Sequence, residues 1–87
     1  MVKVLVPSQL HSYTGGVSRL EAEGGAICDV LDDLDRRFPG LKFRVVDEQD
    51  RIRPHMRLFV GRDAARDIRA RVQDGDELMI FGALSGG

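Results

Sequence analysis

The most distinctive chemistry in this sequence lies at its C-terminus, where residues 82–87 read Gly-Ala-Leu-Ser-Gly-Gly. Because Gly86 and Gly87 have no Cβ, this end can lie extended in a slot too narrow for any other residue. Its side chains offer no titratable group and no metal ligand, so its one reactive group is the α-carboxylate of Gly87. A functional tail would therefore be one whose carboxylate another protein activates. The alternative is a frayed glycine end, and the tail alone leaves both interpretations open.

Other residues that could do chemistry stand apart from one another. Cys28 borders an apolar helical stripe, which favours a half-buried packing thiol over a redox or nucleophilic one. His11 and His55 are far apart, and no second cysteine or spaced histidine pair accompanies them, so we expect surface histidines. The glycine pairs at 15–16 and 24–25 lack the strand-to-helix setting of a phosphate-binding loop. We therefore expect no catalytic residue, no cofactor-binding residue and no metal ligand.

Size and charge narrow the class of protein. Eighty-seven residues predict one domain, and 43% hydrophobic with 31% charged residues is ordinary for a globular protein. A net charge of −1 provides no basic field, so we expect neither a nucleic-acid partner nor an anionic membrane surface. No apolar run is long enough to span a membrane. The single cysteine fits a reducing cytoplasm, which is the location we expect.

The elements that must position the tail begin with a predicted hairpin and a helix. Residues 2–6 alternate valine with other side chains, which is typical of a strand, and Pro7 ends it. Residues 17–23 also alternate, and the glycines at 15–16 permit the reversal between the two strands. An amphipathic helix follows, and Asp32, Asp33 and Asp35 are expected largely on its solvated outer face. Its apolar stripe is Ile27, Val30, Leu31, Leu34 and Phe38.

Three more strands are expected after Pro39-Gly40 ends the helix. They are placed at 43–46, 56–60 and 77–81, and residues 64–72 are expected to form a helical turn or a crossover.

This order of elements predicts an α+β domain with a β-grasp (ubiquitin-like) fold, a mixed five-stranded sheet covered on one face by one main helix. The N-terminal strand would lie beside the C-terminal one. The domain would cover residues 1–81, and residues 82–87 would form a flexible C-terminal diglycine tail.

Alternation along the last two strands predicts an exposed apolar cluster. If Leu58 and Ile80 face the helix, Phe59, Met79 and Phe81 lie on the opposite face of the sheet. We call these three residues the apolar cluster. Such a cluster on a small domain is usually a docking surface, and the alternatives are a dimer contact or a shifted strand register.

Four stretches of the sequence resemble the small ubiquitin-like sulfur carriers of the MoaD/ThiS family. That family includes the small subunit of molybdopterin synthase and the carriers of the thiamine and cysteine pathways. The matching stretches are the turn at 13–16, the helix at 29–34 with its end at 38–41, the turn at 74–78, and the terminal Gly86-Gly87. Each is weak alone, but their order and spacing, with the diglycine last, cover most of the chain.

This resemblance implies a sulfur carrier, which is a protein-borne cosubstrate and not an enzyme. An E1-like adenylating and sulfurtransferase enzyme would use ATP to adenylate the Gly87 carboxylate, and sulfur would replace one oxygen to give a thiocarboxylate. Leu84, Ser85 and Gly86 would thread into the partner, and the apolar cluster would dock it. The sulfur would pass to a synthase of the cysteine synthase or thiazole synthase type, or to the large subunit of molybdopterin synthase.

The sequence departs from the family pattern in two places. Relatives often have proline where Gly82 and Ala83 stand, and a fuller segment where residues 61–66 are rich in arginine and alanine. The pathway therefore stays open, although the connection at 50–55 resembles the cysteine-pathway carriers more than the molybdopterin subunit. Two other functions also remain open: a small subunit of molybdopterin synthase, and a ubiquitin-like modifier that forms isopeptide bonds to lysines.

Overall fold

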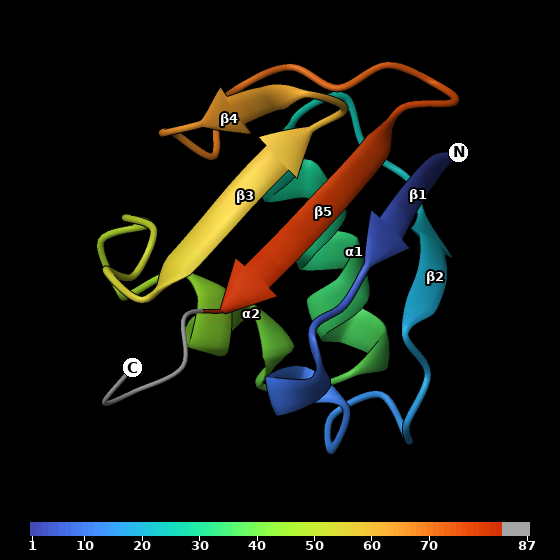
Figure 1. The fold of residues 1–87 in the computed structure, drawn as a ribbon, viewed down its shortest axis with the longest axis vertical. Helices are drawn as coiled ribbons and strands as arrows, with labels where there is room; N and C mark the ends of the chain where they lie inside the picture. The colour runs from blue at the N-terminus through green and yellow to red at the C-terminus, as the bar shows by residue number, and fades with distance from the viewer. Residues whose placement is uncertain (83–87) are drawn as a thin grey trace.

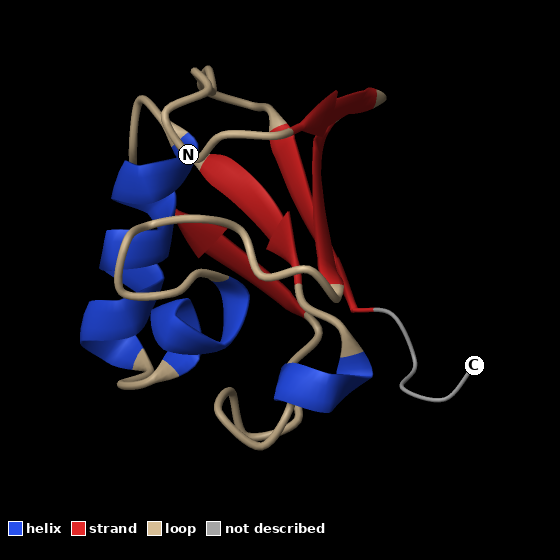
Figure 2. Cartoon of the chain, turned by 90° about the vertical axis from the view of Figure 1, so that its left-hand side faces the viewer, coloured by secondary structure: helices blue, strands red, loops and turns tan. Residues whose placement is uncertain are grey.

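The computed structural model describes residues 1–82. They form one five-stranded sheet with the strand order β2-β1-β5-β3-β4, and two helices pack on one of its faces (Figures 1 and 2). The elements in chain order are β1 (Val2–Leu5), the 3₁₀ helix η1 (Ser8–Leu10), β2 (Arg19–Ala22), α1 (Ile27–Arg37), α2 (Leu41–Val45), β3 (Met56–Val60), β4 (Asp63–Ala65) and β5 (Glu77–Gly82). This mixed sheet with one main helix is the predicted β-grasp fold.

The first and last strands lie side by side in the middle of the sheet. β1 pairs antiparallel with β2, as the predicted hairpin requires, and parallel with β5. β5 also pairs antiparallel with β3, so it is hydrogen-bonded along both edges. The strand that leads into the tail is therefore the central strand of the sheet.

The apolar stripe of α1 forms the centre of the core. Four of its residues have no exposed surface: Ile27, Val30, Leu31 and Leu34. They pack against buried residues of the sheet, which include Val2, Val4, Leu58, Leu78 and Ile80. Phe38 is only partly buried, because α1 ends at Arg37 and the backbone of Phe38 leaves the helical conformation (φ −131°, ψ 78°).

The prediction of a strand at 43–46 is wrong, because most of this segment belongs to the short helix α2. Leu41 and Val45 are four residues apart and fully buried, while Phe43 between them is 52% exposed, which is the spacing of a helix face. Gly40 turns the chain with φ 95°. Asp35, expected to be solvated, accepts hydrogen bonds from the amides of Gly40 (3.1 Å) and Lys42 (3.2 Å) and so holds the start of α2.

The structure has a strand that was not predicted, β4. It lies partly within the segment at 64–72 that was expected to form a helical turn or a crossover. Gly61, with φ 61°, reverses the chain after β3 and lets β4 pair with it in antiparallel register. The predicted number of strands is therefore correct, but one of the five lies elsewhere in the sequence.

Side chains of α1 cover the open edge of β2. Arg37 Nη2 donates a hydrogen bond to the carbonyl of Glu21 (2.7 Å), and Asp33 Oδ2 accepts one from the amide of Glu23 (3.0 Å). The Glu23 amide, with the charges of Arg37 and Arg36, lowers the pKa of Asp33 below its ordinary value. Asp33, expected on a solvated face, thus ties the helix to a sheet edge that would otherwise present free backbone groups.

Candidate functional site

The face of the sheet opposite α1 and α2 is covered by no helix of the described chain (Figure 2). One row of paired positions crosses all five strands on this face. Its members, in strand order, are Arg19, Leu5, Met79, Phe59 and Ala64. Paired residues of neighbouring strands project on the same side of a sheet, so the centre of this row is apolar.

The structure brings the three residues of the apolar cluster together. Phe59 and Met79 are directly opposite each other on β3 and β5, and Phe81 lies diagonally from Phe59. The two phenyl rings meet edge to face, with centroids 5.6 Å apart and planes at 79°. Phe81 is 49% exposed, whereas Phe59 and Met79 are half-buried. The predicted strand register is therefore confirmed, because Leu58 and Ile80 are buried on the other face.

Leu5 extends the apolar cluster, and sequence reasoning did not include it. It pairs with Met79 across the parallel β1–β5 ladder and is half-buried. The available signal was the alternation of β1, because Val4 and Val6 are buried and Leu5 must face the other way. One row away, the face turns polar at Glu21, Lys3 and Glu77, which are paired across three strands.

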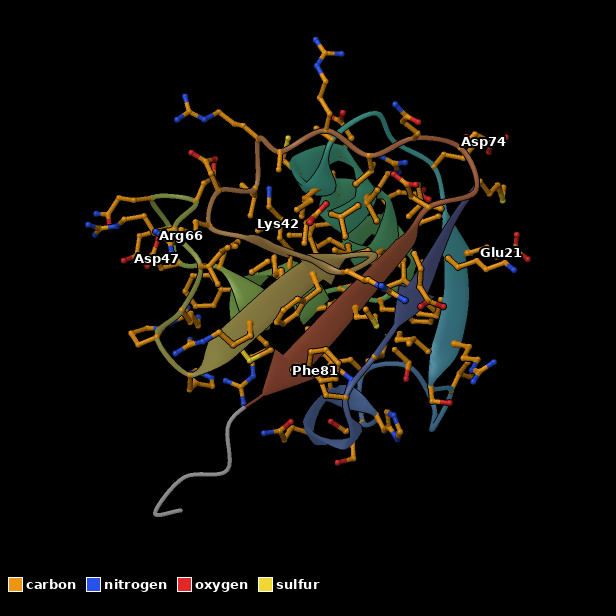
Figure 3. All side chains as sticks on the ribbon, turned by 45° about the horizontal axis from the view of Figure 1, so that its top comes forward. Glu21, Lys42, Asp47, Arg66, Asp74 and Phe81 are labelled. Carbon is orange, nitrogen blue, oxygen red and sulfur yellow. The ribbon has the colours of Figure 1, made fainter. Side chains whose placement is uncertain are left out.

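β5 ends at Gly82, the residue after Phe81 of the apolar cluster, and the tail begins beyond it (Figures 1 and 3). β5 continues through Gly82, which we expected to be the first residue of the tail, and Gly82 pairs with Met56. The Gln9 side chain of η1 occupies the space that a Cβ on Gly82 would need. The predictions for Leu84, Ser85, Gly86 and Gly87 lie outside the described residues.

Arg57 is the charged residue nearest to this corner by register, since it is paired with Phe81. Its Nη1 donates hydrogen bonds to the carbonyls of Pro54 (2.8 Å) and Met56 (2.9 Å). These bonds hold its guanidinium against the turn that enters β3.

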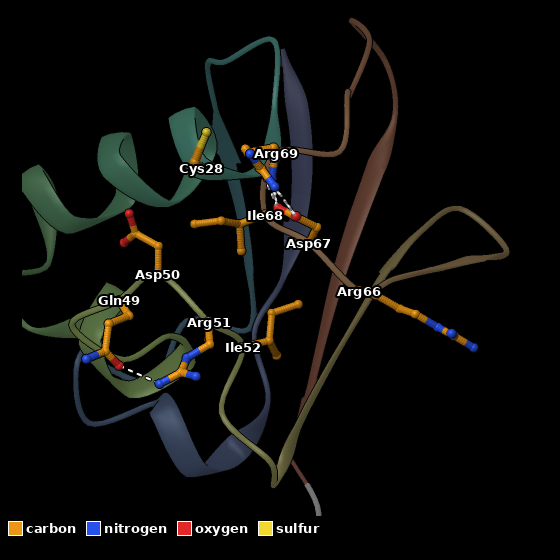
Figure 4. Close-up of a pocket in the computed structure, with 9 residues that line it drawn as sticks. All are labelled: Cys28, Gln49, Asp50, Arg51, Ile52, Arg66, Asp67, Ile68 and Arg69. Atoms are coloured by element: carbon orange, nitrogen blue, oxygen red, sulfur yellow. Dashed lines mark hydrogen bonds and ion pairs between the residues drawn. The ribbon is translucent and has the colours of Figure 1, made fainter.

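Cys28 lines a cavity of about 580 Å³ between the start of α1 and the loops at 49–52 and 66–69 (Figure 4). The thiol is half-buried, as predicted. Asp67 and Arg69 in the same cavity form an ion pair at 2.9 Å, and the Arg69 guanidinium lowers the pKa of Asp67 to about 2. This pair neutralises itself, while Asp50, Arg51 and Arg66 also line the cavity.

The two histidines lie in different surroundings. His11 is half-buried with its Nε2 3.0 Å from the carbonyl oxygen of Val6, and His55 is exposed. Among residues 1–82, no group of three or more His, Cys, Asp or Glu side chains is arranged to hold a metal ion. Within the same residues, no helix has the length and apolar character needed to cross a membrane.

Comparison with known proteins gives full-length relatives. No protein-family model matches the chain. It is 33% identical to a chain of the crystal structure of the Amycolatopsis orientalis BexX/CysO complex, with all of both chains covered and a TM-score of 0.93. It is 28% identical to the sulfur carrier protein CysO of Mycobacterium tuberculosis, over 99% of this chain and 98% of that one. It is 26% identical to small archaeal modifier protein 1 of Haloferax volcanii, with 99% and 98% covered and a TM-score of 0.76.

The topology of the sheet and the helix across it are those of a ubiquitin-like β-grasp protein. With these relatives matched from end to end, the chain belongs to the MoaD/ThiS family of ubiquitin-like sulfur-carrier proteins.

Proposed function

We propose that this protein carries sulfur as a thiocarboxylate on Gly87 and donates it in a biosynthetic reaction. The observation that carries the proposal is the diglycine at residues 86–87, which residues 83–85 separate from the end of the central strand β5 in the sequence, in a chain related from end to end to CysO. The protein binds no cofactor of its own and is a cosubstrate of its partners rather than an enzyme.

The chemistry takes place on the Gly87 carboxylate and is catalysed by a partner. A carboxylate oxygen attacks the α-phosphorus of ATP, pyrophosphate leaves, and an acyl-adenylate remains. A sulfide then attacks the acyl carbon and AMP leaves, so one oxygen of Gly87 is replaced by sulfur. The carrier supplies geometry to this reaction, because effective reaction needs the carboxylate to be placed within a fraction of an ångström.

Two parts of the chain divide that task. The apolar cluster of Phe59, Met79 and Phe81 docks the activating enzyme and the sulfur acceptor, while residues 84–86 thread into the partner and deliver Gly87. Because Phe81 and Gly82 are paired with Arg57 and Met56 of β3, docking at Phe81 fixes the point from which the tail starts. In this proposal the domain at 1–81 positions the tail, and the tail carries the reacting carboxylate.

The likeness to CysO supports the cysteine pathway, with an E1-like adenylating and sulfurtransferase enzyme and a cysteine synthase-like acceptor as cytoplasmic partners. A thiazole synthase-like acceptor and the large subunit of molybdopterin synthase are the other acceptors to test.

A second candidate function follows from the likeness to small archaeal modifier protein 1. In that case Gly87 would form isopeptide bonds to lysines of other proteins. Mass spectrometry of cell proteins would then find lysines that carry the C-terminal residues of this chain, and a sulfur carrier would leave no such remnant.

The Gly87→Ala variant tests the main proposal. We expect the added methyl group to clash in a channel that accepts glycine and to slow adenylation strongly, measured as ATP–pyrophosphate exchange. Docking should survive, because the change lies outside the apolar cluster, and titration calorimetry would measure an unchanged Kd. Exchange as fast as that of the wild type would remove the main support for a carrier.

A further inference from the structure

Positive charge is concentrated in one segment of this chain. Residues 51–71 contain seven arginines and two aspartates, which is a formal charge of +5, although the whole chain carries −1. Asp67 is paired with Arg69 and does not offset the other arginines. The acidic residues instead gather elsewhere, four of them on α1. The surface therefore has a strong local field that the net charge conceals.

Part of this segment forms a groove of about 510 Å³ beside the edge strand β4. Its floor is apolar and includes Ile52, Phe59 and Ala64. Three arginines, Arg53, Arg57 and Arg66, line it, and no acidic residue does.

The three arginines differ in how they are held. Arg53 stacks on Phe43, with its guanidinium carbon 4.5 Å from the ring centroid, and donates to the Phe43 carbonyl (2.7 Å). Arg57 is fixed by its two bonds to backbone carbonyls. Arg66 is exposed and forms no ion pair or hydrogen bond within the described chain. It also lines the Cys28 cavity, but its side chain extends away from the other residues drawn there (Figure 4).

Arg57 and Arg66 line the same groove and lie next to the last pair of the β3–β4 ladder. That last pair is Leu58 with Ala65, and each arginine is the next residue along its chain segment. Like charges at opposite positions of neighbouring strands are unfavourable unless an anion lies between or above them. The arginines that line this groove therefore favour a negatively charged partner.

The groove is continuous with the apolar cluster, because Phe59 belongs to both and Arg57 pairs with Phe81 of the cluster. We propose that this Arg53–Arg57–Arg66 groove binds an acidic segment of the adenylating enzyme while the apolar cluster packs against the enzyme's surface. The inference rests on the proposed function and adds to it a second, electrostatic half of the docking surface. A protein segment fits better than nucleic acid, since apolar residues as well as arginines line the groove.

The electrostatic half should set the speed of docking. Complementary charges at the rim of an interface raise the association rate and make it sensitive to salt, while apolar contacts set the lifetime of the complex. Charge changes in the groove should therefore alter the association rate constant and leave the dissociation rate constant nearly unchanged.

The Arg66→Glu variant tests this inference, and Arg71→Glu is its matched control. Both replace an exposed arginine with the same change of charge, but Arg71 does not line the groove. Stopped-flow or surface plasmon resonance measurements with the adenylating enzyme should show Arg66→Glu associating about tenfold more slowly at low salt, with a flatter salt dependence. Arg71→Glu should behave like the wild type.

Equal association rates and salt slopes for both variants and the wild type would overturn the inference that the groove binds the enzyme. If the enzyme still adenylates all three proteins, the proposed function remains intact. A wild-type protein that the enzyme does not adenylate would overturn the proposed function, and the groove's partner with it. Binding of single-stranded DNA that is lost only in Arg66→Glu would assign the groove to nucleic acid and also overturn the inference.

Discussion

Replacing Phe81 by alanine should separate docking from folding. A phenylalanine side chain offers about 200 Å² of surface, and with 49% of the residue exposed about 100 Å² remains for a partner to cover. At about 25 cal/mol per Å² this burial is worth about 2.5 kcal/mol. Since the alanine Cβ retains a small share, we expect a loss of about 2 kcal/mol, or about thirtyfold in Kd, for binding to the adenylating enzyme.

The fold should tolerate this change. Phe81→Ala removes the edge-to-face contact with Phe59, which is worth about 1 kcal/mol, and leaves the core untouched. Thermal unfolding followed by circular dichroism should therefore show a Tm lower by only a few degrees.

Phe43→Ala is the matched control. Phe43 is 52% exposed, close to the value for Phe81, and likewise has one specific contact, the stacking of Arg53. It lies on α2, in the helical layer that covers the other face of the sheet. Arg53 lines the arginine groove but keeps its hydrogen bond to the Phe43 carbonyl in this variant. Titration calorimetry should therefore find a much smaller loss of affinity for Phe43→Ala than for Phe81→Ala. If Phe43→Ala weakens binding as much as Phe81→Ala, or if Phe81→Ala binds normally, the open face is not the docking surface.

Two further predictions concern stability. Leu31→Ala should lower the free energy of unfolding by about 2–5 kcal/mol through a core cavity, because Leu31 has no exposed surface. Deletion of residues 86–87 should leave that free energy unchanged, and equal losses in denaturant titration would refute this architecture. Asp33→Asn should destabilise the protein at neutral pH. Because the pKa of Asp33 is lowered in the folded state, its contribution is present above its ordinary value of 3.8 and is lost as pH falls through the folded pKa. The stabilities of wild type and variant should therefore converge in acid, and a constant difference down to low pH would contradict this role.

The sequence predicted those elements whose pattern is long. The α1 stripe repeats over more than two turns, and the alternation of β5 spans five residues, so both could be placed, with the apolar cluster on the face opposite Leu58 and Ile80. The segment at 41–45 is too short to decide by periodicity, because Phe43 and Val45 fit a strand as well as Leu41 and Val45 fit a helix. Its conformation is settled by tertiary contacts such as the cap from Asp35.

Other features depend on pairing that the sequence does not reveal. Arg66 and Arg57 line one groove because β4 folds back on β3. Leu5, by contrast, could have been included from the alternation of β1 and the predicted pairing of the first and last strands. β4 has three residues and leaves almost no alternation to detect. The arginine groove was therefore invisible until the register of the edge strand was known.

The most direct test of the central claim is the intact mass of the protein after incubation with its adenylating enzyme, ATP and sulfide. We expect a species heavier by the difference between one sulfur and one oxygen atom, located on Gly87 by fragmentation. A Cys28→Ser variant should form the same species, because the thiol takes no part in the carrier chemistry. Sulfur found on Cys28 instead, or a Gly87 carboxylate unchanged while ATP is consumed, would contradict the account.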